Sequence, residues 1–230
     1  LALNQFIERD RDAMMDRTKK RPLPAGRLQP GQALWFGIGV TVFGLVYLAL
    51  LVNGLSSIVT AAITGTYLFL YTPMKHRTTL STVFGAIPGA LPPVTGWAAA
   101  TNELGLEAGV LFTIMFLWQL PHALALAWLY RDDYARAGFQ LLPIIDPDGR
   151  MTSTQILINC LALTGVSLAP TVIGLTGMLY FYVALLASLS FLGFAIHLTF
   201  TRTSASARKL FFASLVFLLV QFVTMAIDKV

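Results

Sequence analysis

Two long stretches without a charged side chain constrain this sequence more than any other feature. No aspartate, glutamate, lysine or arginine lies between Arg27 and Lys75, and none lies from Met151 to Thr201. A helix needs about 20 apolar residues to cross the hydrocarbon core of a bilayer, so each stretch can hold two passes. Only 12% of the residues are charged, whereas soluble domains average about 25%. We therefore predict an all-α, polytopic membrane protein.

Apolar segments divide the chain into seven complete membrane helices, and residues 1–7 are typical of the end of one more. We expect one domain over residues 1–230 that lacks its true N-terminus. The third segment contains Pro88, Pro92 and Pro93. A helix interrupted in this way persists in a membrane only where neighbours or a cavity satisfy its backbone groups, so we expect it to form a cavity wall. The seven segments are residues 32–52, 56–71, 80–100, 109–129, 154–173, 178–200 and 210–227.

The connecting loops differ in charge. Every lysine and arginine except Lys229 lies in alternate loops, which share one side of the membrane if the helices alternate in direction. Basic loops favour the cytoplasmic side. The pI near 9.6 therefore reflects the basic loops that set the orientation of the protein in the membrane. We expect a lipid bilayer rather than a nucleic acid as the partner. Eight of the eleven acidic residues lie on the same side, although topology does not require them there.

Asn4, Glu8, Asp12 and Asp16 are spaced four residues apart, so on a helix they share one face. Like charges at this spacing repel each other, and a divalent cation would relieve the repulsion. Mg²⁺ is typically held by one or two carboxylates together with substrate phosphates. The alternative is a solvated helix next to the membrane, with its acids paired to neighbouring arginines.

Cations follow these acids. Arg21 and Arg27 lie in a proline-stiffened loop, and Lys75 and Arg77 lie at the end of a later membrane segment. Cations beside a metal-binding face suit a diphosphate. The alternative is an anchor for lipid headgroups.

Polar residues also occur inside an apolar segment, at Gln119 and His122. Ionisable groups within a membrane are costly and indicate function by default, although a histidine at a proline break can also be a satisfied core residue. Asp133 lies between Tyr130 and Tyr134, whose aromatic faces could stabilise a developing cation.

Together these motifs resemble those of the UbiA-type intramembrane prenyltransferases. The face from Asn4 to Asp12 and the following Arg-Pro-Leu-Pro resemble the first motif of that family. Trp-Gln-Leu-Pro-His from Trp118 and Tyr-Arg-Asp-Asp-Tyr from Tyr130 are similar to its heme O synthase branch. The resemblance implies nine helices around a cavity open to the cytosol, in the inner cell membrane, with the first helix and most of the second outside this chain.

The resemblance also implies a reaction and a set of site residues. A farnesyl group passes from farnesyl diphosphate to a vinyl group of heme B, and water completes the hydroxyethylfarnesyl group of heme O. Heme A synthase or cytochrome oxidase assembly proteins are implied as partners. The implied catalytic residues are Asn4, Glu8, Asp12 and Asp133, with Mg²⁺ on Glu8, Asp12 and Asp133. His122 is our own further catalytic candidate, for heme contact or proton transfer. The diphosphate would contact Arg21, Arg27, Lys75, Arg77 and Arg131, and the heme and prenyl pocket would include Trp118, Gln119, Tyr130 and Tyr134.

Two departures from the general family pattern stand out. Glu8 replaces an aspartate, and Tyr130 and Tyr134 occupy the positions of a second Asp-x-x-x-Asp motif. The second change is typical of the heme O branch, and it puts a two-cluster metal site in doubt. The alternatives are a prenyltransferase with another aromatic acceptor, or a transporter with broken helices.

Overall fold

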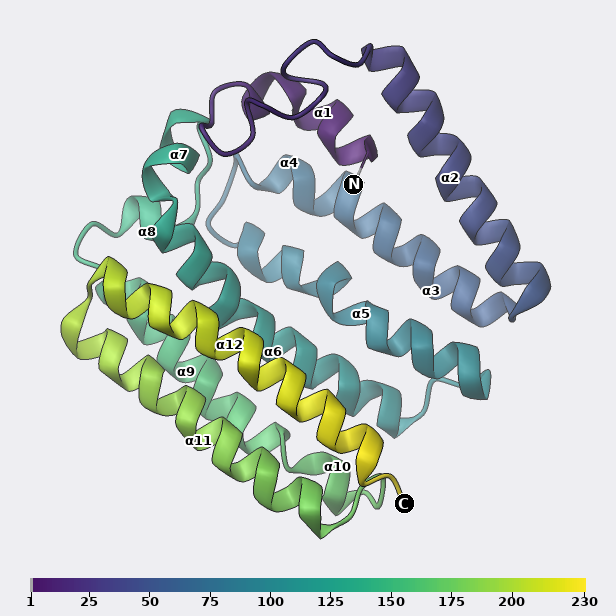
Figure 1. Ribbon diagram of the computed structural model, residues 1–230, viewed down its shortest axis with the longest axis vertical. Coiled ribbons are helices and arrows are strands. Elements are labelled where there is room, and N and C mark those ends of the chain that lie inside the picture. The colour runs from purple at the N-terminus through teal and green to yellow at the C-terminus, as the bar shows by residue number, and fades with distance from the viewer. Residues whose placement is uncertain (1) are drawn as a thin grey trace.

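The computed structural model describes residues 2–230 as a bundle of long helices joined by short connections (Figure 1). The elements are α1 (Ala2–Asp12), α2 (Pro30–Leu51), α3 (Gly54–Gly65), a π-helix (Thr66–Tyr71), α4 (Thr72–Met74), α5 (Ser81–Thr101), α6 (Leu106–Leu129), α7 (Arg131–Arg136), α8 (Leu142–Ile145), α9 (Arg150–Val166), α10 (Ala169–Val172), α11 (Met178–Thr201) and α12 (Ser204–Ile227). The all-α prediction is confirmed.

Six of the described helices are long and apolar enough to cross a membrane: α2, the continuous rod from α3 to α4, α6, the α9–α10 segment, α11 and α12. Their outer faces are strongly apolar, as Trp35 and Phe43 of α2 show, because about 70% of each side chain is exposed (72% and 71%). Such a surface suits lipid rather than water. The chain is therefore a multi-pass membrane protein. A further helix of similar length, α5, packs between α3 and α6.

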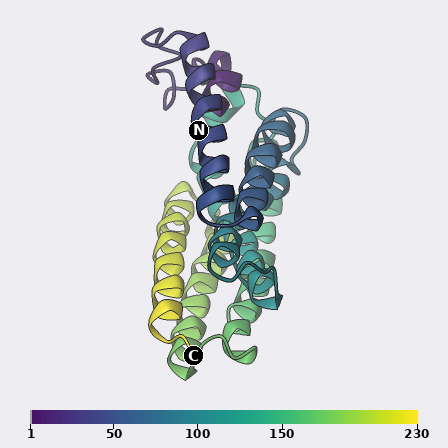
Figure 2. The ribbon, with the colours of Figure 1, turned by 90° about the vertical axis from the view of Figure 1, so that its right-hand side faces the viewer.

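The core lies around α6, which packs against α5, α9 and α12. Its buried centre joins Ile114 and Trp118 of α6 to Ile156 of α9, Phe191 of α11 and Phe217 of α12. The helices α1 to α5 lie on the other side of α6, as the two orthogonal ribbon views show (Figures 1 and 2). This arrangement leaves one face of α6 toward α5 and another toward α12.

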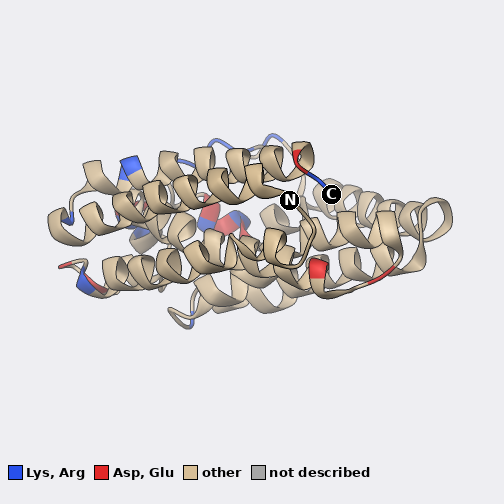
Figure 3. Cartoon of the chain, turned by 90° about the horizontal axis from the view of Figure 1, so that it is seen from below, with Lys and Arg blue, Asp and Glu red and all other residues tan. Residues whose placement is uncertain are grey.

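The charged loops gather at one end of the bundle. The segments that carry them are α1 with the loop after it, the loop after α4, α7 with α8, and the turn between α11 and α12 (Figure 1). The turns α2–α3 and α5–α6 and the C-terminus lie at the opposite end, and the long helices are almost free of charged residues (Figure 3). The predicted alternation of loops is thus observed.

Some predicted boundaries were wrong. The helix expected to begin at residue 210 begins at Ser204, because Thr203 accepts a hydrogen bond from the Ser206 backbone N–H (3.2 Å) and caps the first turn. Arg208 and Lys209 therefore lie on α12 and not in a loop. The segment expected at residues 154–173 is divided between α9 and α10. The short helices α7 and α8 were not predicted.

Gly149 offers a test of how tightly the core is packed. Its φ is +67°, and an added Cβ would lie 2.0 Å from the ring of Trp128, whereas Gly26 has φ +68° with nothing within 4 Å. Both substitutions to alanine share the backbone strain, but only Gly149→Ala adds overpacking, which typically costs about 1–3 kcal/mol. We expect Gly149→Ala to lower the thermal unfolding midpoint in detergent clearly more than Gly26→Ala. Equal midpoints would contradict this packing.

Candidate active site

The face of α1 formed by Asn4, Glu8 and Asp12 points into the protein. All three side chains are buried, with exposed fractions of 6%, 5% and 2%. Asp16 does not continue this face as predicted, because α1 ends at Asp12. Its carboxylate is exposed and contacts Lys19 and Arg136. The hydrogen bond from Lys19, followed by the charges of Lys19 and Arg136, holds the pKa of Asp16 below its ordinary value.

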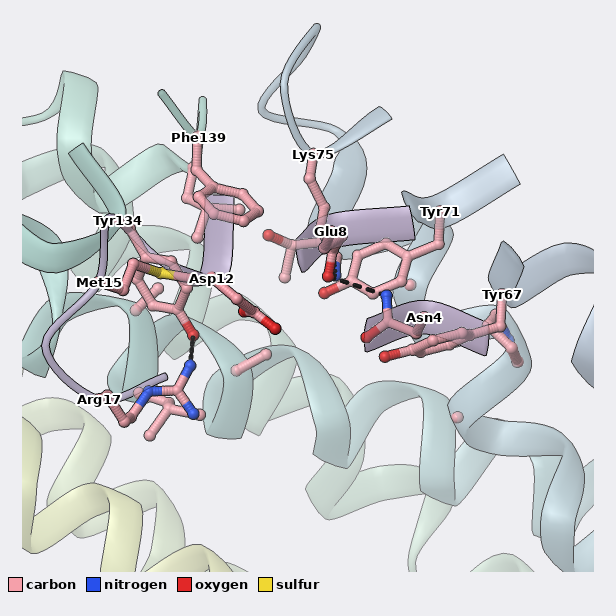
Figure 4. A pocket seen from close by; sticks show the side chains of 18 of the residues that line it. Asn4, Glu8, Asp12, Met15, Arg17, Tyr67, Tyr71, Lys75, Tyr134 and Phe139 are labelled. Carbon is pink, nitrogen blue, oxygen red and sulfur yellow. Dashed lines mark hydrogen bonds and ion pairs between the residues drawn. The ribbon is translucent and has the colours of Figure 1, made fainter. Parts of the chain in front are cut away.

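Each of the two buried acids is paired with one cation from another part of the chain. Lys75 Nζ lies 2.9 Å and 3.1 Å from the two carboxylate oxygens of Glu8. Arg21 donates to Asp12 Oδ2 at 2.8 Å. Asn4 Nδ2 also donates to Glu8 Oε2 at 2.8 Å (Figure 4). Buried charges are stable only when paired and hydrogen-bonded, so these contacts allow two carboxylates to lie inside the bundle.

These groups line one end of a cavity of about 510 Å³. At its charged end, Lys75 faces the α1 residues Asn4 and Glu8 (Figure 4). Arg21 also lines this end, and the other end is a mostly apolar wall from α5 and α6. The lining residues of that wall are Thr82, Gly85, Pro88 and Gly89 of α5, and Gln119, Ala123, Leu126 and Ala127 of α6. The prediction that the proline-rich helix forms a cavity wall is confirmed.

Two glycines of α5 admit larger side chains from neighbouring elements. A Cβ at Gly85 would lie 2.5 Å from the ring of Tyr71, and a Cβ at Gly89 would lie 2.0 Å from the amide of Gln119. Contacts this short do not occur between real atoms, so any larger residue would displace these side chains. The glycines of this helix therefore shape the cavity.

The π-helix contributes two cavity residues that sequence reasoning missed, Tyr67 and Tyr71. Thr72 supports this irregular turn by donating its hydroxyl hydrogen to the Tyr67 carbonyl oxygen (2.8 Å). The ammonium of Lys75 lies 4.5 Å from the centre of the Tyr71 ring, within range of a cation–π interaction. Short π-helical turns are common at functional sites, but no sequence pattern here indicated one.

Arg17 is a third cation at the charged end of the cavity. Its guanidinium lies 5.5 Å and 5.8 Å from the ring centres of Tyr130 and Tyr134, and Nη2 donates to the Tyr134 hydroxyl at 3.3 Å. Burial raises the pKa of Tyr134, and the Arg17 charge opposes this shift. The phenol therefore remains neutral beside the cation.

The model of the UbiA prenyltransferase family matches residues 1–219. The chain belongs to this family. A protoheme IX farnesyltransferase of Solibacter usitatus is 50% identical over 228 residues, which is 99% of this chain and 78% of the relative. A protoheme IX farnesyltransferase of Sorangium cellulosum is 42% identical, over 98% of this chain and 81% of the relative.

Two solved structures share the fold. A digeranylgeranylglyceryl phosphate synthase superposes with a TM-score of 0.80 at 17% identity, covering 99% of this chain and 79% of the synthase. A UbiA homologue from Aeropyrum pernix superposes with a TM-score of 0.75 at 18% identity, covering 98% and 82%. Family membership makes the chain a membrane prenyltransferase, so the transporter alternative is not supported.

Of the predicted site residues, the structure brings seven to the cavity: Asn4, Glu8, Asp12, Arg21, Lys75, Gln119 and Tyr134. The others lie outside its lining. Arg27 and Arg77 are exposed on loops, and Arg131 is exposed at the start of α7. Arg27 donates to the Lys20 carbonyl oxygen (2.6 Å). Tyr130 is 40% exposed and contacts Arg17 rather than the cavity.

His122 and Trp118 lie outside the lining of this cavity. These residues are four apart on α6 and face α12, where His122 Nδ1 lies 2.8 Å from Ser214 Oγ and Trp118 donates to the Ser214 carbonyl oxygen at 2.7 Å. The His122 ring stacks between Trp118 and Phe211. Trp118 and His122 form one stripe of α6 toward α12, while Gln119 and Ala123, each one position further along, form the neighbouring stripe that lines the cavity.

Asp133 also differs from its expected place. Its carboxylate contacts Arg136, which also reaches Asp16 at 2.7 Å. Within residues 2–230, no group of three Asp, Glu, His or Cys side chains converges, so Asp133 does not join Glu8 and Asp12. The two remaining carboxylates, with the Asn4 amide, fit a Mg²⁺ ion that shares its coordination with substrate phosphates.

The buried Glu8–Lys75 pair predicts a strong coupling. Lys75→Met leaves a buried carboxylate without its cation, which typically costs about 3–5 kcal/mol. Adding Glu8→Gln should recover much of that loss, because no buried charge then remains. Unfolding in detergent of the two single variants and the double variant measures this coupling. The exposed Arg9–Asp10 pair is the control, since such pairs contribute at most about 1 kcal/mol. Additive losses at Glu8 and Lys75 would contradict the pairing.

Proposed function

We propose that this protein transfers the farnesyl group of farnesyl diphosphate to a vinyl group of heme B, giving heme O and diphosphate. The observation that carries the proposal is the 50% identity to a protoheme IX farnesyltransferase over 99% of the chain. The cavity supports it, because one end can bind a charged diphosphate and the other can take an apolar chain.

In this proposal the α1 face binds the metal and the diphosphate. Glu8 and Asp12, with Asn4, would hold Mg²⁺, which when bound neutralises the diphosphate and makes it a better leaving group. Lys75, Arg21 and Arg17 supply further positive charge at the same end of the cavity. Arg27 and Arg77 on exposed loops, with Arg131 at the exposed start of α7, raise the local positive potential that attracts an anionic substrate.

The aromatic residues serve the carbon that is transferred. As the bond to the diphosphate weakens, the farnesyl carbon gains positive charge, and the ring faces of Tyr67, Tyr71 and Tyr134 on the cavity wall can stabilise it. A cavity with little water strengthens such interactions. We assign His122 and Asp133 to support: His122 packs α6 on α12, and Asp133 positions Arg136.

We also propose that the charged end of the bundle faces the cytoplasm, in the inner membrane of a bacterial cell. Fifteen of the sixteen lysines and arginines are carried by loops or helix ends on this side, and such loops are retained on the cytoplasmic side. A diphosphate substrate made in the cytosol would then reach the cavity without crossing the membrane.

The α1 face supplies a matched test of the metal-binding proposal. Glu8→Gln and Asp12→Asn remove buried charges, while Asp10→Asn removes a carboxylate on the same helix whose side chain is 87% exposed. We expect each buried substitution to lower heme O formation on the order of 100-fold, as for loss of a preorganised electrostatic group, and Asp10→Asn to leave it nearly unchanged. Hemes extracted from membranes that contain the intact protein are measured by mass spectrometry. Wild-type rates for Glu8→Gln and Asp12→Asn would end the assignment.

A further inference from the structure

The apolar wall of the cavity ends where α5 and α6 touch. The two helices run in opposite directions, so α5 begins at the charged end of the bundle and α6 ends there (Figure 1). Of the residues that line the cavity, Gly89 lies furthest along α5 from the charged end, and Gln119 lies furthest from it along α6. They are in contact, because a Cβ at Gly89 would lie 2.0–2.4 Å from the amide atoms of Gln119. We call this contact the floor of the cavity.

Beyond the floor, side chains of the same two helices fill the space. An apolar cluster there includes Val94 and Trp97 of α5, Ala108 and Phe112 of α6, and Val59 of α3. None of these residues lines the cavity. A hydrocarbon chain that enters from the charged end and follows the α5–α6 wall therefore meets the floor before it can reach the cluster.

The amide of Gln119 is held firmly in this position. Its oxygen is inaccessible to solvent, and the amide packs against the α5 backbone at Gly89, where no side chain intervenes. The apolar cluster lies beyond it, and protein interiors are packed as densely as organic crystals, so they yield little to an inserted group. The floor is therefore a rigid obstacle rather than a loose surface side chain.

The depth of the wall is close to the length of a farnesyl chain. The lining of α6 runs from Ala127 near the charged end to Gln119, and at about 1.5 Å per residue this part of the helix is about 12 Å long. The α1 face from Asp12 to Asn4 has the same length. An extended isoprene unit contains four carbon–carbon steps and spans roughly 5 Å, given bond lengths of about 1.5 Å. Two units are thus shorter than the wall, the third reaches the floor, and a fourth would extend past it.

We propose that Gln119, held against Gly89, limits the prenyl group that this enzyme transfers to three isoprene units. The inference rests on the proposed function, and it adds the residue that selects farnesyl diphosphate over the longer geranylgeranyl diphosphate. Gln119 acts through its size and position at the far end of the chain, so it determines specificity without touching the reacting carbon. Pockets that distinguish substrates by one methylene do so about 10–200-fold, and a whole isoprene unit beyond a rigid floor is a larger mismatch.

The test measures chain-length preference in the intact protein. Membranes that contain it are supplied with heme B and equal amounts of geranyl, farnesyl and geranylgeranyl diphosphate, and the prenylated hemes are quantified by mass spectrometry. Competition in one mixture gives the ratio of the kcat/KM values, so a lower overall activity does not obscure the result. Gln119→Ala removes most of the floor, and we expect the use of geranylgeranyl relative to farnesyl diphosphate to rise at least about tenfold.

Three further substitutions separate the size of the floor from its chemistry. Gln119→Asn removes one methylene and keeps the amide, so it should raise the same ratio with less disturbance of the packing. Gln119→Leu removes the amide and keeps the approximate size, so it should leave the ratio nearly unchanged. Gly89→Ala pushes the amide into the cavity, and the use of farnesyl relative to geranyl diphosphate should fall at least about tenfold.

Leu126→Ala is the matched control, because it enlarges the same wall of α6 nearer to the charged end. The preferred chain length should stay the same, and a rise equal to that of Gln119→Ala would overturn the inference. Unchanged ratios in the Gln119→Ala, Gln119→Asn and Gly89→Ala proteins would also overturn it, as would an unchanged protein that uses geranylgeranyl as readily as farnesyl diphosphate. An unchanged protein that prenylates no heme from any of the three diphosphates overturns the proposed function itself.

Discussion

The pairing of Glu8 with Lys75 inside the bundle is the interaction on which the rest of the site depends. A carboxylate cannot remain ionised in a membrane protein interior unless a cation and further donors meet it, and here the cation comes from the end of the rod formed by α3 and α4. The backbone of Lys75 also holds the loop after α7 in place, because its carbonyl oxygen accepts a hydrogen bond from the Gln140 N–H at 2.8 Å. One buried ion pair thereby joins α1, the loop after α4 and the loop after α7 around the same cavity.

This placement divides the cavity into two environments with different chemistry. At the charged end, Asp12 and Arg21 form a second, partly buried pair, so charge is present before any substrate arrives and little reorganisation is needed when it does. Along α5 and α6 the wall is apolar apart from Thr82 and Gln119. A substrate with a diphosphate head and a hydrocarbon chain matches this division.

The sequence predicted the position of a side chain where helical spacing alone fixes it. It did not do so where the packing of neighbouring elements fixes it. Asn4, Glu8 and Asp12 could be placed together because a four-residue spacing on a helix fixes a common face, whereas Asp16 could not be excluded because nothing in its spacing reveals where α1 ends. His122 was misplaced for another reason. On α6 nearly every residue is apolar, so periodicity does not distinguish the face toward α12 from the face toward the cavity. The π-helix that presents Tyr67 and Tyr71 depends on tertiary packing and left no pattern to recognise.

Replacement of the second acidic motif by Tyr130 and Tyr134 has a physical reading in this arrangement. Two carboxylates at these positions would neutralise Arg17 or attract a second metal ion. Two phenols instead stack against Arg17, and because burial raises the pKa of Tyr134, that ring contributes no negative charge. Asp133 and Asp16 both form ion pairs with Arg136, and no carboxylate among the described residues pairs with Arg17. Its positive charge therefore stays available at the cavity, where a phosphate oxygen can meet it. In this chain, an arginine held by two aromatic rings supplies positive charge beside the buried acidic face of α1.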